Sequence, residues 1–172
     1  TQAADVALEP ARHATLLIGM HVRHSQGTPD PFATHIDNIT TMEHAFIAAA
    51  RVATIGSMRN TSCYVLIASD REEAIARMAT GLDGVCQVQA VKREASSLRS
   101  SSRAEHGLFT GITFMAELYA LSRCPIVFLS SGSSSSELIG ALALRTRGHR
   151  AFMWQYDQKF IEVTASQQLG LT

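Results

Sequence analysis

The sequence lacks a surplus of charge of either sign, and this absence excludes several classes of partner. Lysine plus arginine and aspartate plus glutamate number 15 each, so no net field attracts the chain to nucleic acid or to an anionic membrane. The sequence also lacks a basic block, an RNA-binding motif and an apolar run long enough to span a membrane. We therefore expect neither a nucleic-acid partner nor a membrane span in this chain.

Cysteine is scarce as well. The three cysteines, Cys63, Cys86 and Cys124, are widely spaced and form no CxxC pair. Cys63 and Cys124 lie in apolar segments that have the pattern of strands. We therefore expect small buried side chains rather than a disulfide framework or a metal site.

Only two asparagines are present, and each opens an N-glycosylation sequon, Asn38-Ile39-Thr40 and Asn60-Thr61-Ser62. Because such sequons are used on the surface loops of secreted proteins, we expect the secretory pathway, in the Golgi or ER lumen. The chain starts at Thr1 with neither a start methionine nor a signal sequence, so we expect it to be part of a longer protein.

What the sequence does contain is a regular alternation of strand and helix patterns. Apolar runs predict strands over residues 15–20, 63–68, 126–129 and 151–154, and an edge-like strand over residues 85–91. Helical periodicity predicts helices over about residues 40–56, 71–80, 111–123 and 138–147, and a terminal helix from Asp157. This order predicts an α/β fold, a Rossmann-like, doubly wound, mostly parallel sheet with helices on both faces.

A chain of 172 residues is long enough for one ordinary domain with its own core. We expect a linker or strap over residues 1–14, a Rossmann-like domain over residues 15–156, and a C-terminal helix or tail over residues 157–172.

Polar side chains follow three of the predicted strands. His21 and Arg23 follow the first, Asp70 follows the second, and Ser133, Ser134, Ser135 and Ser136 follow the fourth and open a helix. Ligands of such sheets bind at the carboxyl ends of the strands, and the arginine fork suits phosphate. Backbone N–H groups at a helix start also bind phosphate. The sequence therefore predicts a site for a phosphorylated or nucleotide-linked ligand.

Each of these residues also has a purely structural interpretation. Arg23 could pair with a carboxylate, and His21 with a backbone carbonyl. Asp70, three residues before Glu73, has the spacing of a helix N-cap, and the serines could simply cap the next helix. Glu117, inside an apolar helix, could accept the N–H groups of a guanine or could face solvent.

Several short motifs of the sequence resemble those of a known family. Residues 18–24 resemble the GxHxR segment of the GDP-fucose-dependent fucosyltransferases, the group of α1,6-, α1,2- and protein O-fucosyltransferases. Residues 64–70, 114–124 and 126–138 resemble, in the same order, that family's later strand, helix and serine-loop motifs. The resemblance covers roughly residues 15–144.

The resemblance implies the C-terminal, donor-binding half of a GT-B fold, and an inverting transfer from the donor substrate GDP-fucose without a metal or other cofactor. It implies that Arg23 is the catalytic residue, which contacts the β-phosphate and stabilises departing GDP, and that residues 133–136 cradle the pyrophosphate. It places His21 and Glu117 near guanine and ribose, and Asp70 near the nucleotide-sugar. A glycan or protein acceptor would bind through an N-terminal domain that this chain does not contain.

Several positions depart from the family's pattern and keep other functions open. His24 stands where α1,6 and α1,2 members have a second arginine, and Glu137 lies where the serine motif ends in an arginine. The acidic residue that the family has shortly after its second arginine is absent from His24-Ser25-Gln26, and Pro125 stands where the helix motif ends in an acid. These departures favour a non-catalytic relative, either a pseudoenzyme or a scaffold subunit of a larger assembly. A third alternative is an unrelated sugar-phosphate-binding α/β domain, whose serine loop would not need Arg23.

Overall fold

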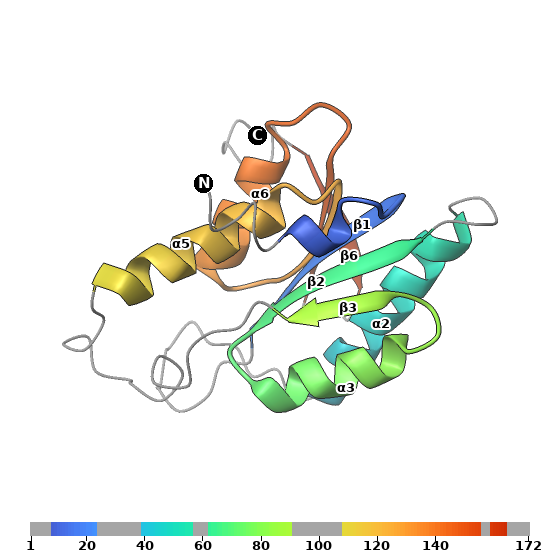
Figure 1. Cartoon of the computed structure of the whole chain (residues 1–172). Coiled ribbons are helices and arrows are strands. Elements are labelled where there is room, and N and C mark those ends of the chain that lie inside the picture. Colours follow the sequence, from blue (N-terminus) through green and yellow to red (C-terminus); the bar gives the residue numbers. More distant parts are fainter. Residues whose placement is uncertain (1–7, 24–38, 57–61, 91–107, 156–158, 165–172) are drawn as a thin grey trace.

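A six-stranded sheet forms the centre of the molecule (Figure 1). The structure, a computed structural model, describes residues 8–23, 39–56, 62–90, 108–155 and 159–164. The strands are β1 (Leu16–Val22), β2 (Cys63–Ser69), β3 (Gln87–Ala90), β4 (Ile126–Ser130), β5 (Arg150–Trp154) and β6 (Phe160–Val163). The helices are a short 3-10 helix, η1 (Glu9–Ala11), and α2 (Ile39–Gly56), α3 (Glu72–Leu82), α5 (Leu108–Ser122) and α6 (Ser134–Ala143).

The strand order in the sheet is β3-β2-β1-β4-β5-β6. All neighbouring pairs run parallel except β5 and β6, which are antiparallel. Parallel neighbours need crossover connections, and here the connections include helices, as expected for βαβ units. The predicted α/β fold with a doubly wound, mostly parallel sheet is confirmed.

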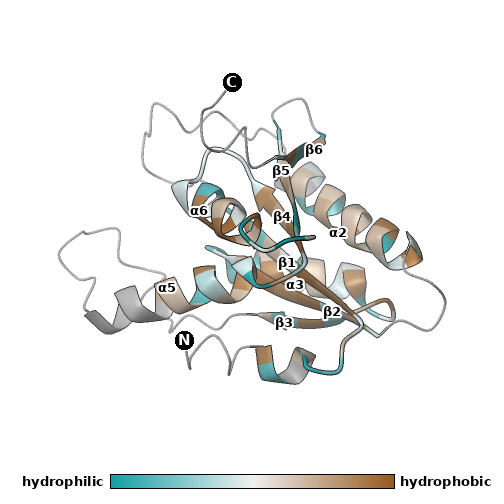
Figure 2. Ribbon diagram, turned by 90° about the horizontal axis from the view of Figure 1, so that it is seen from above, coloured by the Kyte–Doolittle hydropathy of each residue, from teal (hydrophilic) through white to brown (hydrophobic). Residues whose placement is uncertain are grey.

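Helices cover both faces of the sheet, α2 and α3 on one and α5 and α6 on the other (Figures 1 and 2). Met42 and Phe46 of α2 lie in one buried apolar cluster with Ile18 of β1. Leu118 of α5 and Ile139 of α6 lie in a second cluster on the opposite face. Because both faces are buried, the central strands are apolar throughout, which makes them recognisable in the sequence. Within the described ranges, no helix combines the length and the apolarity needed to cross a bilayer.

Strand β1 lies between β2 and β4, and its side chains point alternately to the two faces of the sheet. Leu16, Ile18, Met20 and Val22 belong to the cluster under α2 and α3. Gly19 faces α5, and a Cβ atom there would lie 3.1 Å from the carbonyl oxygen of Leu121. The absence of a side chain at Gly19 therefore lets the end of α5 pack closely against the middle of the sheet.

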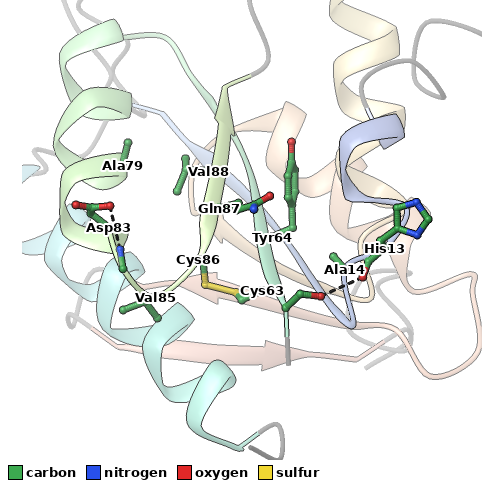
Figure 3. A pocket seen from close by; sticks show the side chains of 12 residues that line it. His13, Ala14, Cys63, Tyr64, Ala79, Asp83, Val85, Cys86, Gln87 and Val88 are labelled. Carbon is green, nitrogen blue, oxygen red and sulfur yellow. Dashed lines mark hydrogen bonds between the residues drawn. A yellow bond between two sulfur atoms is a disulfide. The ribbon is translucent and has the colours of Figure 1, made fainter. Parts of the chain in front are cut away.

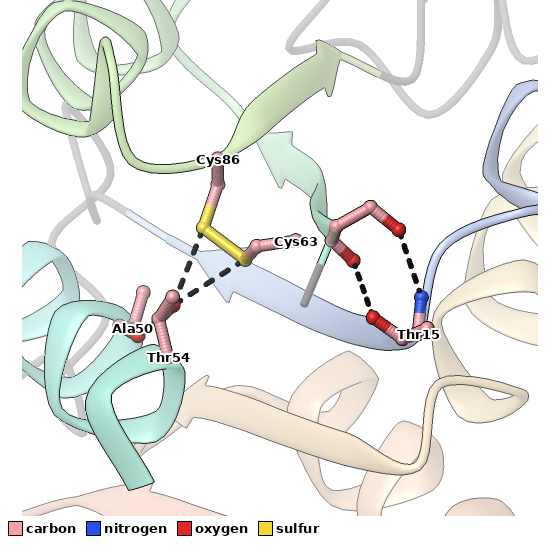
Figure 4. The surroundings of a disulfide bond; sticks show 6 residues. Thr15, Ala50, Thr54, Cys63 and Cys86 are labelled. Carbon is pink, nitrogen blue, oxygen red and sulfur yellow. Dashed lines mark hydrogen bonds between the residues drawn. A yellow bond between two sulfur atoms is a disulfide. The ribbon is translucent and has the colours of Figure 1, made fainter. Parts of the chain in front are cut away.

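The expectation for the cysteines is wrong in one respect, because Cys63 and Cys86 form a disulfide (Figure 4). The parallel register pairs Tyr64 of β2 with Gln87 of β3, which places the two preceding residues side by side. The hydroxyl of Thr54 lies 3.4 Å from the sulfur of Cys63 and 3.5 Å from that of Cys86. Cys124 is free and buried, as expected, and burial raises the pKa of its thiol to about 12.

The expectation of a terminal helix is also wrong for the described part of that segment, because Phe160–Val163 form strand β6. Phe160 explains why this segment joins the sheet. Its ring lies 5.0 Å from that of Phe46 and 5.1 Å from those of Phe128 and Trp154, measured between centroids. Packing into this aromatic group favours an extended segment beside β5 over a helix.

Candidate functional site

The candidate site lies at the carboxyl ends of β1 and β4. From β1 the chain continues to β2 and β3 on one side of the sheet, and it then returns to place β4 and β5 on the other side. The boundary between β1 and β4 is therefore the point where the strand order reverses, and open α/β sheets bind their ligands at such a point. His21 and Arg23 end one of these strands, and the serine-rich segment follows the other.

A buried chain of hydroxyl groups connects the two strand ends. Nδ1 of His21 lies 2.8 Å from Oγ of Ser136, and the His21 side chain is buried. Oγ of Ser136 lies 3.5 Å from Oγ of Ser130, which accepts the backbone N–H of Arg23 at 3.1 Å. Nδ1 of His21 thus meets a serine hydroxyl. These contacts fix the backbone of Arg23 relative to the start of α6.

Arg23 itself is exposed, and its guanidinium forms no ion pair or hydrogen bond with any described residue. The structural alternative, in which Arg23 pairs with a carboxylate of its own domain, is therefore absent from the described part of the chain. An arginine fork without a counterion at the carboxyl edge of such a sheet is suited to bind two oxygens of one phosphate at once.

The start of α6 offers unused hydrogen-bond donors. Helix α6 begins at Ser134, four residues earlier than the sequence predicts, so residues 134–136 lie within its first turn rather than before it. Ser133 is the N-cap residue, yet its side chain makes no capping bond. Its hydroxyl is buried and has no hydrogen-bond partner among the described residues. Gly132 has a φ of 70°, which turns the chain from β4 into the helix. The uncapped N–H groups and the helix dipole favour an anion there.

Asp70 follows β2 and is half-buried. The expectation that it caps α3 is wrong, because Arg71 is the N-cap residue and makes no side-chain capping bond. Oγ of Ser69 accepts the backbone N–H of Arg71 at 3.2 Å, so Ser69 has taken the local role expected of Asp70. Asp70 is therefore not the N-cap of α3.

Glu117 is buried, with 1 % of its surface exposed, so the alternative that it faces solvent is wrong. Glu117 lies one helical turn before Leu121 in α5. The carbonyl oxygen of Leu121 lies next to Gly19 of β1, which fixes the position of α5 along the strand. One turn of helix covers about 5.4 Å, and two residues of strand cover about 6.6 Å. Glu117 on α5 therefore lies about level with His21 on β1, on the same face of the sheet.

Sequence reasoning missed Arg71. Its Nη2 atom is buried and has no hydrogen-bond partner among the described residues. The sequence does carry one signal for Arg71: it directly follows Asp70 at the end of a predicted strand, where a long cationic side chain can reach a ligand at the edge of the sheet.

Among the described residues, no group of three or more His, Cys, Asp or Glu side chains is placed to hold a metal ion.

Of two hollows in the described structure, one adjoins this arrangement and the other lies far from it. One, of about 720 Å³, adjoins the start of α6 and is lined by Ser134, Glu137 and Gln155 together with apolar side chains. The other, of about 760 Å³, lies at the opposite, amino edge of the sheet beside the disulfide (Figure 3). In this second hollow the carboxylate of Asp83 accepts the N–H of Gly84. We assign it no ligand.

The fold is that of a Rossmann-like domain, with an exposed arginine and the start of a helix at the carboxyl edge of its sheet. No protein-family model matches the sequence. No curated protein matches it either. Solved structures do match in fold, and several are fucosyltransferases. The structure of NodZ α-1,6-fucosyltransferase soaked with GDP-fucose has a TM-score of 0.62 and 16 % identity, over 95 % of this chain and 47 % of that chain.

Two further matches agree. The fucosyltransferase NodZ from Bradyrhizobium has a TM-score of 0.58 and 17 % identity, over 95 % of this chain and 46 % of that chain. A mutant of Arabidopsis thaliana FUT1 in complex with GDP has a TM-score of 0.54 and 13 % identity, over 92 % of this chain and 35 % of that chain. The chain thus has the fold of one part of these fucosyltransferases and spans about half the length of NodZ. The resemblance seen in the sequence is confirmed at the level of the fold.

Proposed function

We propose that this chain is the donor-binding half of a fucosyltransferase-like, inverting glycosyltransferase, and that it binds GDP-fucose at the carboxyl edge of its sheet. The observation that carries this proposal is the exposed Arg23, which has no counterion among the described residues and lies beside the uncapped start of α6. The fold shared with structures that contain GDP or GDP-fucose supports the nature of the ligand.

In the proposed reaction an acceptor hydroxyl attacks the anomeric carbon of fucose, and the bond from that carbon to the β-phosphate oxygen breaks. Negative charge then accumulates on departing GDP. Arg23 would bind the β-phosphate, and the backbone N–H groups and hydroxyls of residues 133–136 would bind the pyrophosphate. These donors are fixed before the reaction, so they stabilise the leaving group without reorganising. The proton of the acceptor hydroxyl would pass to a base outside this half.

The remaining predicted residues would contact the nucleoside and sugar. Ser136 holds His21 through Nδ1, which fixes the orientation of the imidazole ring at the end of β1. Glu117 lies level with it and would accept donor N–H groups of guanine, while Asp70 would accept sugar hydroxyls. These roles agree with their positions on one edge of the sheet.

A glycan or protein acceptor would bind mainly to an additional domain, because the chain spans about half of NodZ. We place the protein in the Golgi or ER lumen. The two sequons support this location, and so does the Cys63–Cys86 disulfide, because disulfides persist in oxidising compartments.

One observation favours a second candidate, a non-catalytic relative used as a scaffold. Glu137 lies exposed in the first turn of α6, where its charge opposes a bound phosphate. Its side chain lines the hollow beside β6, away from β1, which reduces this repulsion. A domain that has lost donor binding would not bind nucleotides, whereas the proposed donor-binding half would bind guanine nucleotides.

The test is a thermal-shift titration of the chain with GDP, GDP-fucose, UDP and ADP. At a concentration about a hundredfold above Kd, a ligand stabilises the folded state by about 2.7 kcal/mol, or roughly 5–11 °C in Tm. We expect this shift with guanine nucleotides only. Arg23→Ala should weaken it about tenfold to a hundredfold in Kd without lowering Tm in buffer.

Arg147 provides the matched control, because it is exposed in the connection between α6 and β5 at the opposite edge of the sheet. Arg147→Ala removes the same charge and should leave the shift unchanged. No shift with any nucleotide in the unmodified chain would favour the scaffold candidate. An equal shift with all four would favour a general anion site.

A further inference from the structure

We infer that Arg71 is a second phosphate-binding arginine of this site and that, together with Arg23, it selects diphosphate over monophosphate ligands. The inference rests on the proposed function and deepens it, because it names the chemical group that the edge of the sheet recognises. It is carried by one juxtaposition: two guanidinium groups without counterions among the described residues follow the ends of the adjacent strands β1 and β2.

The backbone of Arg71 is held firmly. Its N–H is donated to Oγ of Ser69, and its carbonyl accepts the N–H of Ile75 at 3.3 Å in the first turn of α3. The Cα atom of Arg71 is therefore fixed, and only the side chain can adapt to a ligand.

The side chain is held in an unfavourable state. Nη2 is buried, but it donates no hydrogen bond to any described residue. A buried polar group without a partner costs free energy, and more so when it is charged. Glu72 and Glu73 follow immediately on α3, yet both are exposed and neither forms an ion pair with Arg71 in the described structure. An anion that reaches Nη2 would supply the missing partner.

Two other arginines of the domain, by contrast, are paired with carboxylates. Arg77 holds both carboxylate oxygens of Glu43, at 2.6 and 2.8 Å. Arg150 holds both carboxylate oxygens of Glu162, at 2.7 and 2.9 Å. Arg150 lies at the start of β5, away from the carboxyl edge, and Arg77 lies in the middle of α3, whereas Arg23 and Arg71 directly follow strand ends at that edge. The fold thus neutralises Arg77 and Arg150, whereas Arg23 and Arg71 at the site have no described counterion; Arg147, which also has none, lies at the opposite edge of the sheet.

The positions of the two arginines suit a ligand with two phosphates. Val22 pairs with Ser69 in the parallel register, so Arg23 follows one member of this pair directly and Arg71 follows the other by two residues. Neighbouring strands lie about 4.8 Å apart. Arg23 lies just beyond the end of β1 and Arg71 just beyond the end of β2, so positive charge borders this edge at two neighbouring positions. Two phosphate groups can then each receive a guanidinium, whereas one phosphate can use only one of them fully.

The experiment measures binding of GDP, GMP and inorganic pyrophosphate by isothermal titration calorimetry to the unmodified chain and to Arg71→Gln, Arg71→Lys and Arg147→Gln. We expect Arg71→Gln to raise Kd for GDP and pyrophosphate about tenfold to a hundredfold. It should change Kd for GMP much less, so the preference for diphosphate falls. Arg71→Lys keeps the charge but not the fork and should recover part of the affinity. Arg147→Gln should have no effect.

A stability measurement separates binding from a structural role. Because Nη2 has no described partner, Arg71→Gln should leave Tm in buffer unchanged or raise it. A lower Tm together with unchanged GDP binding would show that Arg71 is structural and would overturn the inference.

The outcomes also separate this inference from the proposed function. If the unmodified chain binds GDP and Arg71→Gln binds it equally well, the donor site stands and the role of Arg71 is refuted. If the chain binds pyrophosphate through Arg71 without preferring guanine nucleotides, the diphosphate site stands and the GDP-fucose assignment fails. If it binds neither GDP nor pyrophosphate, both are refuted.

Discussion

The Cys63–Cys86 disulfide should contribute a large share of the stability of this domain, and its removal is a direct test of the fold. The bridge joins the start of β2 to the segment that enters β3, across 23 positions of sequence that include α3. We consider the double variant Cys63→Ala/Cys86→Ala, which removes the cross-link without leaving a single reactive thiol in its place.

The expected loss follows from the length of the closed loop. Loop-closure entropy for a loop of this size is worth about 3.4 kcal/mol at room temperature. Small domains have about 5–15 kcal/mol of stability in total, so this is a substantial fraction. It corresponds to a fall of roughly 7–14 °C in Tm. Thr54 adds little to the loss, because its hydroxyl keeps its bond to the carbonyl of Ala50 at 2.8 Å.

The assay has two parts. Thiol titration of the denatured, unreduced chain should find one free thiol, that of Cys124, and three after reduction. Thermal melting should then show the same fall in Tm for the reduced chain as for the double variant, and the variant itself should not respond to reductant.

Three free thiols before reduction would show that the bridge does not form. A bridge that is present but can be reduced without any change in Tm would refute the loop-closure argument. In that case the pairing of β2 with β3 alone would hold this part of the fold.

Three further predictions concern packing and ionisation. Gly19→Ala should destabilise the domain by about 1–3 kcal/mol in denaturant unfolding, because the new Cβ would lie 3.1 Å from the carbonyl oxygen of Leu121; an unchanged midpoint would show that α5 can move away freely. Arg150 lowers the pKa of Glu162, so this pair stabilises the fold above the ordinary carboxyl pKa and loses its effect as pH falls through the lowered value. Glu162→Gln should therefore be slightly less stable than the unmodified chain at pH 7 and equally stable in strong acid. The difference in stability should be small because both side chains of the pair are about half exposed. A difference in stability that stays constant at all pH values would contradict this. Cys124, buried and with its thiol pKa raised to about 12, should resist iodoacetamide at pH 8 until the chain unfolds, and rapid alkylation of the native chain would show that α5 opens readily.

The sheet could be predicted from sequence because burial on both faces leaves continuous apolar runs. Residues 63–68 form such a run, and the structure places all of them in β2. The site edge could be predicted for a related reason: polar residues that directly follow such runs must lie where the strands end. Ser133 and Arg23 are recognisable in this way.

The errors arose where tertiary pairing decides the outcome. The spacing of Cys63 and Cys86 carries no local signal, and only the register between β2 and β3 brings them together. The segment at Phe160 is short and has no strong period, and its strand depends on aromatic partners far away in sequence. Arg71 was missed because its isolation from counterions is a property of the folded chain alone.

The short strands at the margins of the sheet have a consequence for association between molecules. In the described sheet, β3 and β6 are the outermost strands, and each has only four residues. An exposed edge strand has unpaired backbone N–H and C=O groups that can pair with a strand of another molecule. Short edge strands that carry charged side chains disfavour such pairing. Glu162 places an exposed carboxylate on β6, tied to Arg150 of the neighbouring strand. A domain of this kind can therefore be concentrated with little tendency to polymerise through its sheet.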